Sequence, residues 1–358
     1  AVRLPLLLQL GAAWALRSEL RAESRPEKLI YFLHIPRTAG TSFIADAKAS
    51  LKTKRSRVKF QHMEGCFDWR EEFEREPQMA VMIRSPRHLV YSEYLLCAEG
   101  PISIMTQAPP PEKNGFKTWI YKWNEILRSG GGTGDFSQGV GLKPQLMVKM
   151  PVTYTNLTFK CYNPANLMSQ RLSCKLPFKY PEKIDVDHAV RNMHKAWFVG
   201  ITEAYQESLC LFNFKVYGTL PKYCNCLDQA AWDDFPHATT SYHDVRLKSA
   251  PLSEQEEEVV EMIDNMTVLD LKLYDAAVER FKREVHEVEA KLGVKLLCKT
   301  LPDPRAKMGV KSKAWPPPRQ RLPPPSQEER QRMEQSMRLV AHASQRKTNP
   351  AVQALFED

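Results

Sequence analysis

The sequence predicts an α/β protein in which helices flank a central parallel sheet. Three apolar runs rich in β formers lack the alternation of a half-exposed strand, and they cover residues 28–35, 79–83 and 196–201. A helical pattern follows each run, at residues 41–51, 87–97 and 203–214. Strands that alternate with helices are typical of a parallel sheet, because each helix carries the chain back to the edge where the strand began. Helices are therefore expected to cover both faces of the sheet.

Two more helical segments are expected. Trp119, Tyr121 and Trp123 predict a packed helix in the middle of the chain, with a glycine-rich loop after it. Apolar residues recur every three or four positions over residues 253–292, which predicts a long helical region with a break near Asn265.

The composition divides the chain into three parts. Beyond Cys298 the apolar pattern ends and proline triplets begin. The expected parts are an N-terminal targeting segment and stem at 1–27, one folded domain at 28–298 and a proline-rich, basic, largely disordered tail at 299–358. Net charge is +9, and residues 301–358 contribute 11 Lys and Arg against 6 Asp and Glu, or +5 of it. The folded domain is thus only mildly basic, which argues against a nucleic-acid binder.

Several features indicate the secretory pathway. The apolar run 4–16 is shorter than the ~20 residues that span a bilayer, so it fits a signal peptide or part of a signal anchor, with a buried or amphipathic helix as the alternative. Asn156 and Asn265 begin N-glycosylation sequons. The eight cysteines are even in number, which fits disulfides, and Cys161–Cys174 is a plausible local bridge.

A zinc site is the alternative use of some cysteines. Cys224 and Cys226 lie near His237 and His243 in the sequence. No second pair stands at the spacing usual for zinc ligands. Disulfides are therefore the preferred interpretation, and no metal is expected.

The loop after the first strand has the features of an anion cradle. Small residues follow one another at Thr38, Ala39, Gly40, Thr41 and Ser42, just before a helix. Backbone N–H groups can converge there, and the helix N-terminus adds partial positive charge. Arg37 supplies a full charge, and Thr41 and Ser42 supply hydroxyls. The Gly-Lys-Ser/Thr ending of a Walker A loop is missing, which makes an ordinary kinase or GTPase less suitable. A helix capped by Thr or Ser is the alternative interpretation.

A second anion site is expected after the second strand. Arg84 stands at the carboxyl end of that strand, the edge where open α/β sheets bind ligands. Ser92 follows about two helical turns later, and Pro86 suits the first turn of the helix. One guanidinium and one hydroxyl can together hold a phosphate.

These segments resemble Golgi carbohydrate sulfotransferases, most closely the heparan sulfate 2-O and 6-O sulfotransferase group. The loop His34–Phe43 is similar to that family's 5′-phosphosulfate loop, and Arg84 with Ser92 to its 3′-phosphate site. Three further segments resemble family motifs in the same order, at 161–172, 197–203 and 269–274. The resemblance covers about residues 28–290. It implies a P-loop NTPase-like three-layer fold.

The resemblance also implies an activity. The expected reaction transfers a sulfuryl group from 3′-phosphoadenosine 5′-phosphosulfate to a glycan hydroxyl, with no metal required. Arg37, Thr38, Ala39, Gly40, Thr41 and Ser42 would hold the 5′-phosphosulfate, and Arg84 and Ser92 the 3′-phosphate. Arg37 stands where the family usually has Lys. The expected location is the Golgi membrane, as a single-pass type II protein with a lumenal catalytic domain.

The general base is expected in the segment 60–69. His62 is the first candidate and Glu64 the reserve, because either can accept a hydroxyl proton. Strict alignment of Asp68-Trp69 with the family's motif puts Cys66 where the catalytic His should be. A histidine without a catalytic role is the alternative.

The acceptor is expected to be an anionic polysaccharide. Lys52, Lys54 and Arg55 begin a basic run just before His62, which suits a sulfated or uronic glycan, although a solvated face explains it equally. Two other functions stay open. One is a glycan-binding pseudoenzyme that lost its base at Cys66. The other is a different P-loop group-transfer enzyme such as a small-molecule kinase, for which no strand end supplies a metal-binding Asp.

Overall fold

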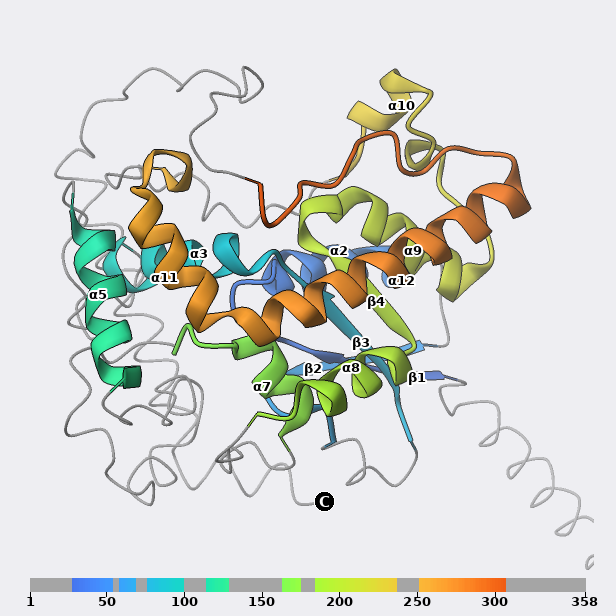
Figure 1. Cartoon of the computed structure of the whole chain (residues 1–358). Coiled ribbons are helices and arrows are strands. Elements are labelled where there is room, and N and C mark those ends of the chain that lie inside the picture. Colours follow the sequence, from blue (N-terminus) through green and yellow to red (C-terminus); the bar gives the residue numbers. More distant parts are fainter. Residues whose placement is uncertain are drawn as a thin grey trace, which may run out of the picture. The chain divides into compact units, whose positions relative to one another are not determined.

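Four parallel strands form the sheet, in the spatial order β2-β1-β3-β4 (Figure 1). The computed structural model describes residues 28–53, 58–68, 76–99, 114–128, 163–174, 184–236 and 251–306. The strands are β1 (Lys28–Leu33), β2 (Val58–Met63), β3 (Gln78–Ile83) and β4 (Phe198–Ile201). Helices flank this sheet, so the predicted α/β fold is confirmed.

The strands differ in burial. Ile30 to Leu33 in β1, Met79 to Ile83 in β3 and all of β4 are buried. Strand β2 is not among the predicted strands, because it is an outer strand of this sheet with a mixed burial pattern that includes exposed Lys59 and His62. A continuous apolar run therefore identifies only the strands that are covered on both faces.

Helices α2 (Gly40–Thr53) and α9 (Tyr205–Tyr217) cover one face. A cluster of rings joins this pair to the sheet through Phe32, Phe43, Phe60, Phe198 and Phe212, with centroids 5.0–6.3 Å apart. Figure 1 shows α7 (Leu167–Ser173) and α8 (Val186–Lys195) on the other side of the sheet, with α12 (Val268–Leu292) packed against both. The flanking helices therefore bury the strands from both sides.

A second apolar cluster lies among α3 (Pro86–Glu99), α5 (Gly115–Arg128) and α11 (Glu257–Met266). Trp119 and Trp123 are fully buried there, which confirms the expected packed helix, whereas Tyr121 is exposed. Helices α11 and α12 meet at Thr267, close to the break expected near Asn265. The shorter elements are η4 (Thr202–Ala204), η5 (Lys222–Cys224), α10 (Gln229–Asp233) and η7 (Leu252–Glu254).

The described chain stays packed past the expected end of the domain. Arg87 makes a two-pronged ion pair with Asp264, at 2.7 and 2.6 Å, and donates to the carbonyl of Ala306 at 2.8 Å. The segment after α12 is thereby tied to α3. The expected N-terminal segment, the glycine-rich loop and the tail beyond Ala306 lie outside the described residues.

The disulfides correct two expectations. Between described residues they join Cys66 to Cys174, Cys210 to Cys224 and Cys226 to Cys298. The expected Cys161–Cys174 bridge is wrong, because α7 brings Cys174 against the segment that follows β2 instead. The zinc interpretation of Cys224 and Cys226 is wrong as well, since a sulfur in a disulfide is no thiolate ligand.

No described cysteine is free, as expected for an oxidising compartment. A membrane-crossing helix, long and apolar enough to span a bilayer, does not occur in the described part of the chain.

Candidate anion-binding site at the carboxyl edge of the sheet

The loop between β1 and α2 has an unusual backbone. Arg37 and Ala39 have φ angles of 63° and 62°, in the left-handed region, on either side of the buried Thr38. Such a conformation costs about 1–2 kcal/mol at a non-glycine residue, so the surroundings must hold it. Thr38 Oγ1 donates to the Ile35 carbonyl at 2.9 Å, which closes the turn. Turns of this kind bring successive backbone N–H groups onto one concave surface, which suits an anion.

The predicted loop ends where helix α2 begins. Ala39 is the residue before the helix, and its carbonyl accepts the first bond of α2, from Phe43 N at 3.0 Å. Thr41 is exposed and Ser42 is half-buried, so both hydroxyls can be reached. The helix N-terminus and these hydroxyls therefore lie at the same edge of the sheet as the end of β1.

The two predicted anion sites meet. Arg37 Nε donates to Ser92 Oγ at 2.9 Å, although the two residues are 55 positions apart. Arg84 Nη1 donates to the carbonyl of Arg37 at 2.8 Å. Arg37, Arg84 and Ser92 thus form one polar cluster at the carboxyl ends of β1 and β3. The sequence predicted Arg37 from the loop after the first strand, Arg84 from the end of the second strand and Ser92 from its place two helical turns later, and the fold brings the three together.

Arg84 is the half-buried cation of this cluster. Burial lowers the pKa of its guanidinium to about 10, while the negative charges of Glu203 and Glu93 oppose that shift and Arg37 adds to it. Arg84 is therefore still charged at neutral pH. Its Nε is buried without a hydrogen-bond partner among the described residues. An unused buried donor on a cation is a suitable contact for an anionic ligand.

Residues of the two motif segments 197–203 and 269–274 hold the loops of this cluster in place through hydrogen bonds. Thr202 Oγ1 donates to the carbonyl of Thr38 at 2.9 Å, and Glu203 Oε1 accepts from Ser85 N at 3.0 Å. Tyr274 donates to the other oxygen of Glu203 at 3.3 Å. Burial raises the pKa of the Glu203 carboxyl, against the effect of Arg84. Glu203 and Thr202 therefore hold the two loops that carry Arg37 and Arg84.

The two base candidates lie in different surroundings. His62 is an exposed residue of β2, and its Nε2 lies 3.0 Å from Lys48 Nζ of α2. Burial and the charge of Lys48 lower the pKa of His62. Glu64 follows the last residue of β2, at the carboxyl edge, and its Oε1 lies 3.6 Å from Nδ1 of His34. Of the two predicted bases, Glu64 is therefore nearer the loop.

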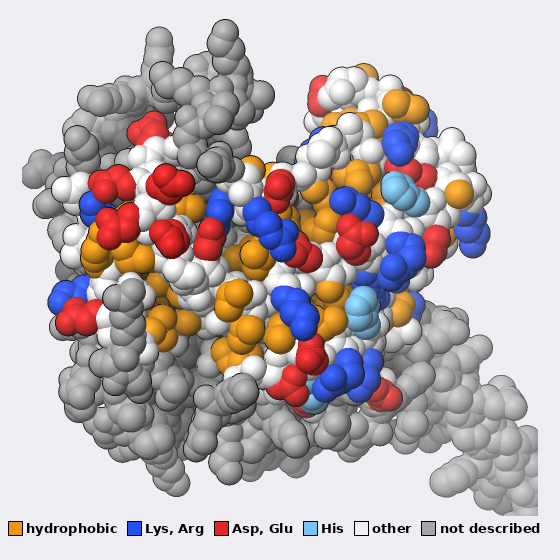
Figure 2. All heavy atoms as spheres, viewed as in Figure 1, with side chains coloured by type: hydrophobic (Ala, Val, Ile, Leu, Met, Phe, Trp, Pro, Cys, Tyr) orange, Lys and Arg blue, Asp and Glu red, His pale blue; other side chains and the backbone are white. Residues whose placement is uncertain are grey.

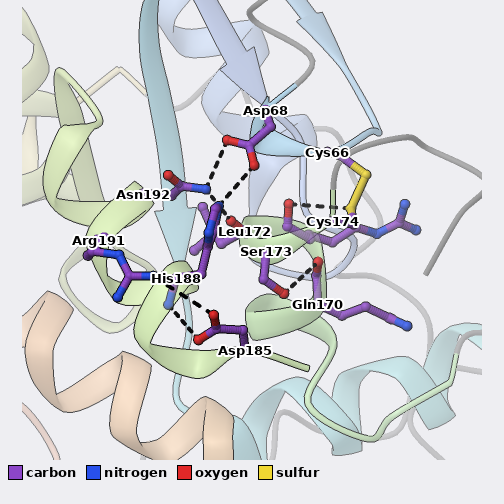
Figure 3. A network of polar contacts seen from close by, with 11 residues as sticks. Cys66, Asp68, Gln170, Leu172, Ser173, Cys174, Asp185, His188, Arg191 and Asn192 are labelled. Atoms are coloured by element: carbon purple, nitrogen blue, oxygen red, sulfur yellow. Dashed lines mark hydrogen bonds and ion pairs between the residues drawn. A yellow bond between two sulfur atoms is a disulfide. The ribbon is translucent and has the colours of Figure 1, made fainter. Parts of the chain in front are cut away.

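Asp68 and Cys66 have structural partners (Figure 3). Asp68 accepts from His188 Nε2 at 2.9 Å and from Asn192 Nδ2 at 3.1 Å, which ties the segment after β2 to α8. Cys66 is fully buried and bonded to Cys174 at the end of α7. The sulfur of Cys66 therefore cannot serve as a base in this state.

The sequence-predicted acceptor residues are only partly described. Lys52 is exposed near the end of α2, whereas Lys54, Arg55 and Asn156 lie outside the described residues. Asn265 is exposed near the end of α11. Figure 2 shows Asp and Glu side chains gathered at the upper left of the described face, whereas Lys and Arg side chains are interspersed with Asp and Glu over the rest of it. Within the described ranges, no group of three or more His, Cys, Asp or Glu is arranged to hold a metal ion.

His34, Thr202 and Glu203 lie inside the sequence motifs but had no predicted roles of their own. His34 lies near the end of the first predicted strand, and Thr202 and Glu203 follow the third, so their positions were the available signal. No family model matches this chain, and no curated protein matches it either.

Proposed function

We propose that this protein transfers a sulfuryl group from 3′-phosphoadenosine 5′-phosphosulfate to a hydroxyl of a glycan. One observation carries the proposal: Arg37, Arg84 and Ser92 form a hydrogen-bonded cluster beside the N-terminus of α2. Two phosphate groups on one nucleotide need two adjacent anion sites, and this edge of the sheet offers both.

The chemistry of these groups fits the donor. The N–H groups and hydroxyls at Thr41 and Ser42 suit the 5′-phosphosulfate, together with the concave turn that contains Thr38, Ala39 and Gly40. Arg84, with its unused Nε, and the hydroxyl of Ser92 suit the 3′-phosphate. Arg37 lies between the two sites, where its charge reaches both phosphates.

The residues of this edge have separate tasks in the reaction. Sulfuryl transfer proceeds by in-line displacement, with charge growing on the leaving phosphate oxygen. Arg37 stabilises that charge, and Thr202 and Glu203 hold the two loops in position. A base beside the loop removes the proton of the acceptor hydroxyl, and of the two predicted candidates Glu64 lies nearer to the loop than His62.

Nucleotide binding tests the two-site arrangement. Isothermal calorimetry compares adenosine 3′,5′-bisphosphate with AMP, which lacks the 3′-phosphate. A charge-assisted hydrogen bond contributes about 1.5–3 kcal/mol, so AMP should bind at least about tenfold more weakly. Arg84→Ala should abolish this preference, whereas Arg191→Ala, at an exposed arginine of α8, should retain it. Equal affinity of the wild type for both nucleotides would exclude a 3′-phosphate site.

A binding protein without turnover is the second candidate, and the state of Cys66 favours it. The alignment with the family motif puts Cys66 at the catalytic position, and its sulfur is held in a disulfide. Mass spectrometry of a panel of glycans incubated with the donor separates the two candidates. Sulfated product supports the enzyme, and donor binding with no product supports the binding protein. A sulfated or uronic polysaccharide is the acceptor expected to react.

We also propose a Golgi location with the domain in the lumen. The disulfides and the exposed sequon residue Asn265 support it. Expression in a eukaryotic cell should give a protein whose mobility increases after endoglycosidase treatment. The double substitution Asn156→Gln/Asn265→Gln should remove that shift.

A further inference from the structure

His34 lies at the boundary between β1 and the loop. Its backbone N–H donates to the carbonyl of Met63 at 2.9 Å, so the ladder between β1 and β2 extends by one residue. This contact puts His34 beside Glu64 at the carboxyl edge. His62 lies two residues further back, which is about 7 Å along a strand. Of these two imidazoles, that of His34 is therefore the nearer to the loop.

The ring of His34 packs on the first residue of α2. A Cβ added to Gly40 would lie 2.1 Å from Cδ2 and 2.6 Å from Nε2 of His34. The edge of the ring that carries Nε2 thus rests against the helix N-terminus. The phosphosulfate would bind at this turn under the proposed function, so Nε2 lies beside the reacting group.

The other ring nitrogen faces a carboxylate. Glu64 Oε1 is 3.6 Å from His34 Nδ1, an ion-pair distance slightly longer than a hydrogen bond. Its negative charge favours the tautomer with the proton on Nδ1, which leaves a lone pair on Nε2. The side chains of His34 and Glu64 are 17% and 28% exposed, so a ligand can reach the pair.

Burial and the charges around the ring keep it neutral before the donor binds. Burial, followed by the positive charges of His62, Arg171 and Arg37, lowers the pKa of His34 to about 4. A neutral imidazole can accept a proton. Bound phosphosulfate brings negative charge beside the ring, and negative charge raises the pKa of an imidazole. Binding of the donor would therefore strengthen this base.

We propose that His34, oriented by Glu64, is the general base of the reaction. The acceptor hydroxyl gives its proton to Nε2 while its oxygen bonds to sulfur. The bond from sulfur to the 5′-phosphate oxygen breaks, and that oxygen keeps the electron pair. Glu64 stabilises the imidazolium, which later returns its proton to solvent. This inference rests on the proposed function, because a base acts only if the group is transferred here.

Chemical rescue tests the inference. His34→Ala should lower kcat by about 10²–10⁴-fold and leave the affinity for adenosine 3′,5′-bisphosphate nearly unchanged. Added imidazoles of similar size but different pKa should restore turnover, and the restored rate should rise with the pKa of the added base. The matched control is His188→Ala, which removes another carboxylate-paired histidine, that of the Asp68 contact. Its turnover should stay close to that of the wild type.

The outcomes separate the two proposals. A wild type that transfers no sulfuryl group would overturn the proposed function, and this inference with it. An active wild type together with a fully active His34→Ala variant would overturn the inference alone. Rescue that is independent of the pKa of the added imidazole would also overturn it, because it would mean that the ring only fills space.

Discussion

At the residue scale, the candidate site depends on the positions of a few side chains and on the backbone conformation of a few residues. Arg37 and Ala39 adopt left-handed backbone conformations without being glycines, and Thr38 between them is held by contacts with both the loop and η4. Gly40, in contrast, is not among the residues with positive φ. Its lack of a side chain serves the close approach of the His34 ring.

Gly40→Ala should therefore lower activity through His34. Alanine is about 1 kcal/mol more favourable than glycine inside a helix, so backbone preference alone predicts no loss. The added methyl group must displace the His34 ring, which should lower kcat in a sulfuryl-transfer assay. In the His34→Ala background the same substitution should have little further effect. Additive losses in this double-mutant cycle would contradict the contact.

At the element scale, two helices cap each other. Asn166 Oδ1 accepts from Leu269 N and Asp270 N at 2.8 and 3.1 Å, in the first turn of α12. Asp270 in turn accepts from Met168 N and Ser169 N at 3.1 and 2.7 Å, in the first turn of α7. The free N–H groups of both helix starts are thereby satisfied. This exchange fixes α7, whose Arg171 is near His34.

The buried cap should make stability depend on pH. Burial raises the pKa of Asp270 from 3.8 to about 6, against the effect of its hydrogen bonds to Ser169 and Met168. The folded protein therefore binds more protons than the unfolded chain between these values. The stability from this group is full below pH 3.8 and is lost as pH rises through about 6.

Urea unfolding of the wild type and Asp270→Asn measures this effect. Between acid and neutral pH, the wild type should lose on the order of 3 kcal/mol relative to the variant, which cannot ionise. Asn166→Ala is the control, because it removes the uncharged half of the same pair and should cost about 1–2 kcal/mol at every pH. A constant difference between the wild type and Asp270→Asn would show that this carboxyl titrates normally.

At the scale of the whole molecule, disulfides join segments that are far apart in the sequence. Cys66–Cys174 links the segment after β2 to α7 across 108 positions, and Cys226–Cys298 spans 72 positions. Cys210–Cys224 spans only 14 positions, from α9 to η5. The longest link fastens the segment that carries Glu64 and Asp68 to the helix that carries Arg171.

The disulfides should differ in their contribution to stability. In the chain-entropy model a loop of about 100 residues is worth about 4.7 kcal/mol and one of about 15 residues about 3 kcal/mol. Replacing Cys66 and Cys174 by alanine should therefore destabilise the protein by about 1–2 kcal/mol more than replacing Cys210 and Cys224. Urea unfolding under oxidising conditions measures both pairs. An equal or reversed order would mean that native packing outweighs loop length here.

Local patterns in the sequence determined the strands that are covered on both faces and the helices that follow them. They also determined that Arg37 follows the first strand, that Arg84 ends the second and that Ser92 lies about two helical turns later, because the periodicity of strands and helices is visible in neighbouring residues. The outer strand β2 was not predicted, because its residues are only partly buried and form no continuous apolar run.

The tertiary structure alone decided which distant residues meet. Cys174 is paired with Cys66 and not with Cys161, Gly40 makes room for His34, and Asp270 caps α7. Each of these contacts depends on how helices and loops pack over the sheet. These contacts cannot be read from the sequence, because packing brings together residues that are far apart along the chain and follow no helix or strand periodicity.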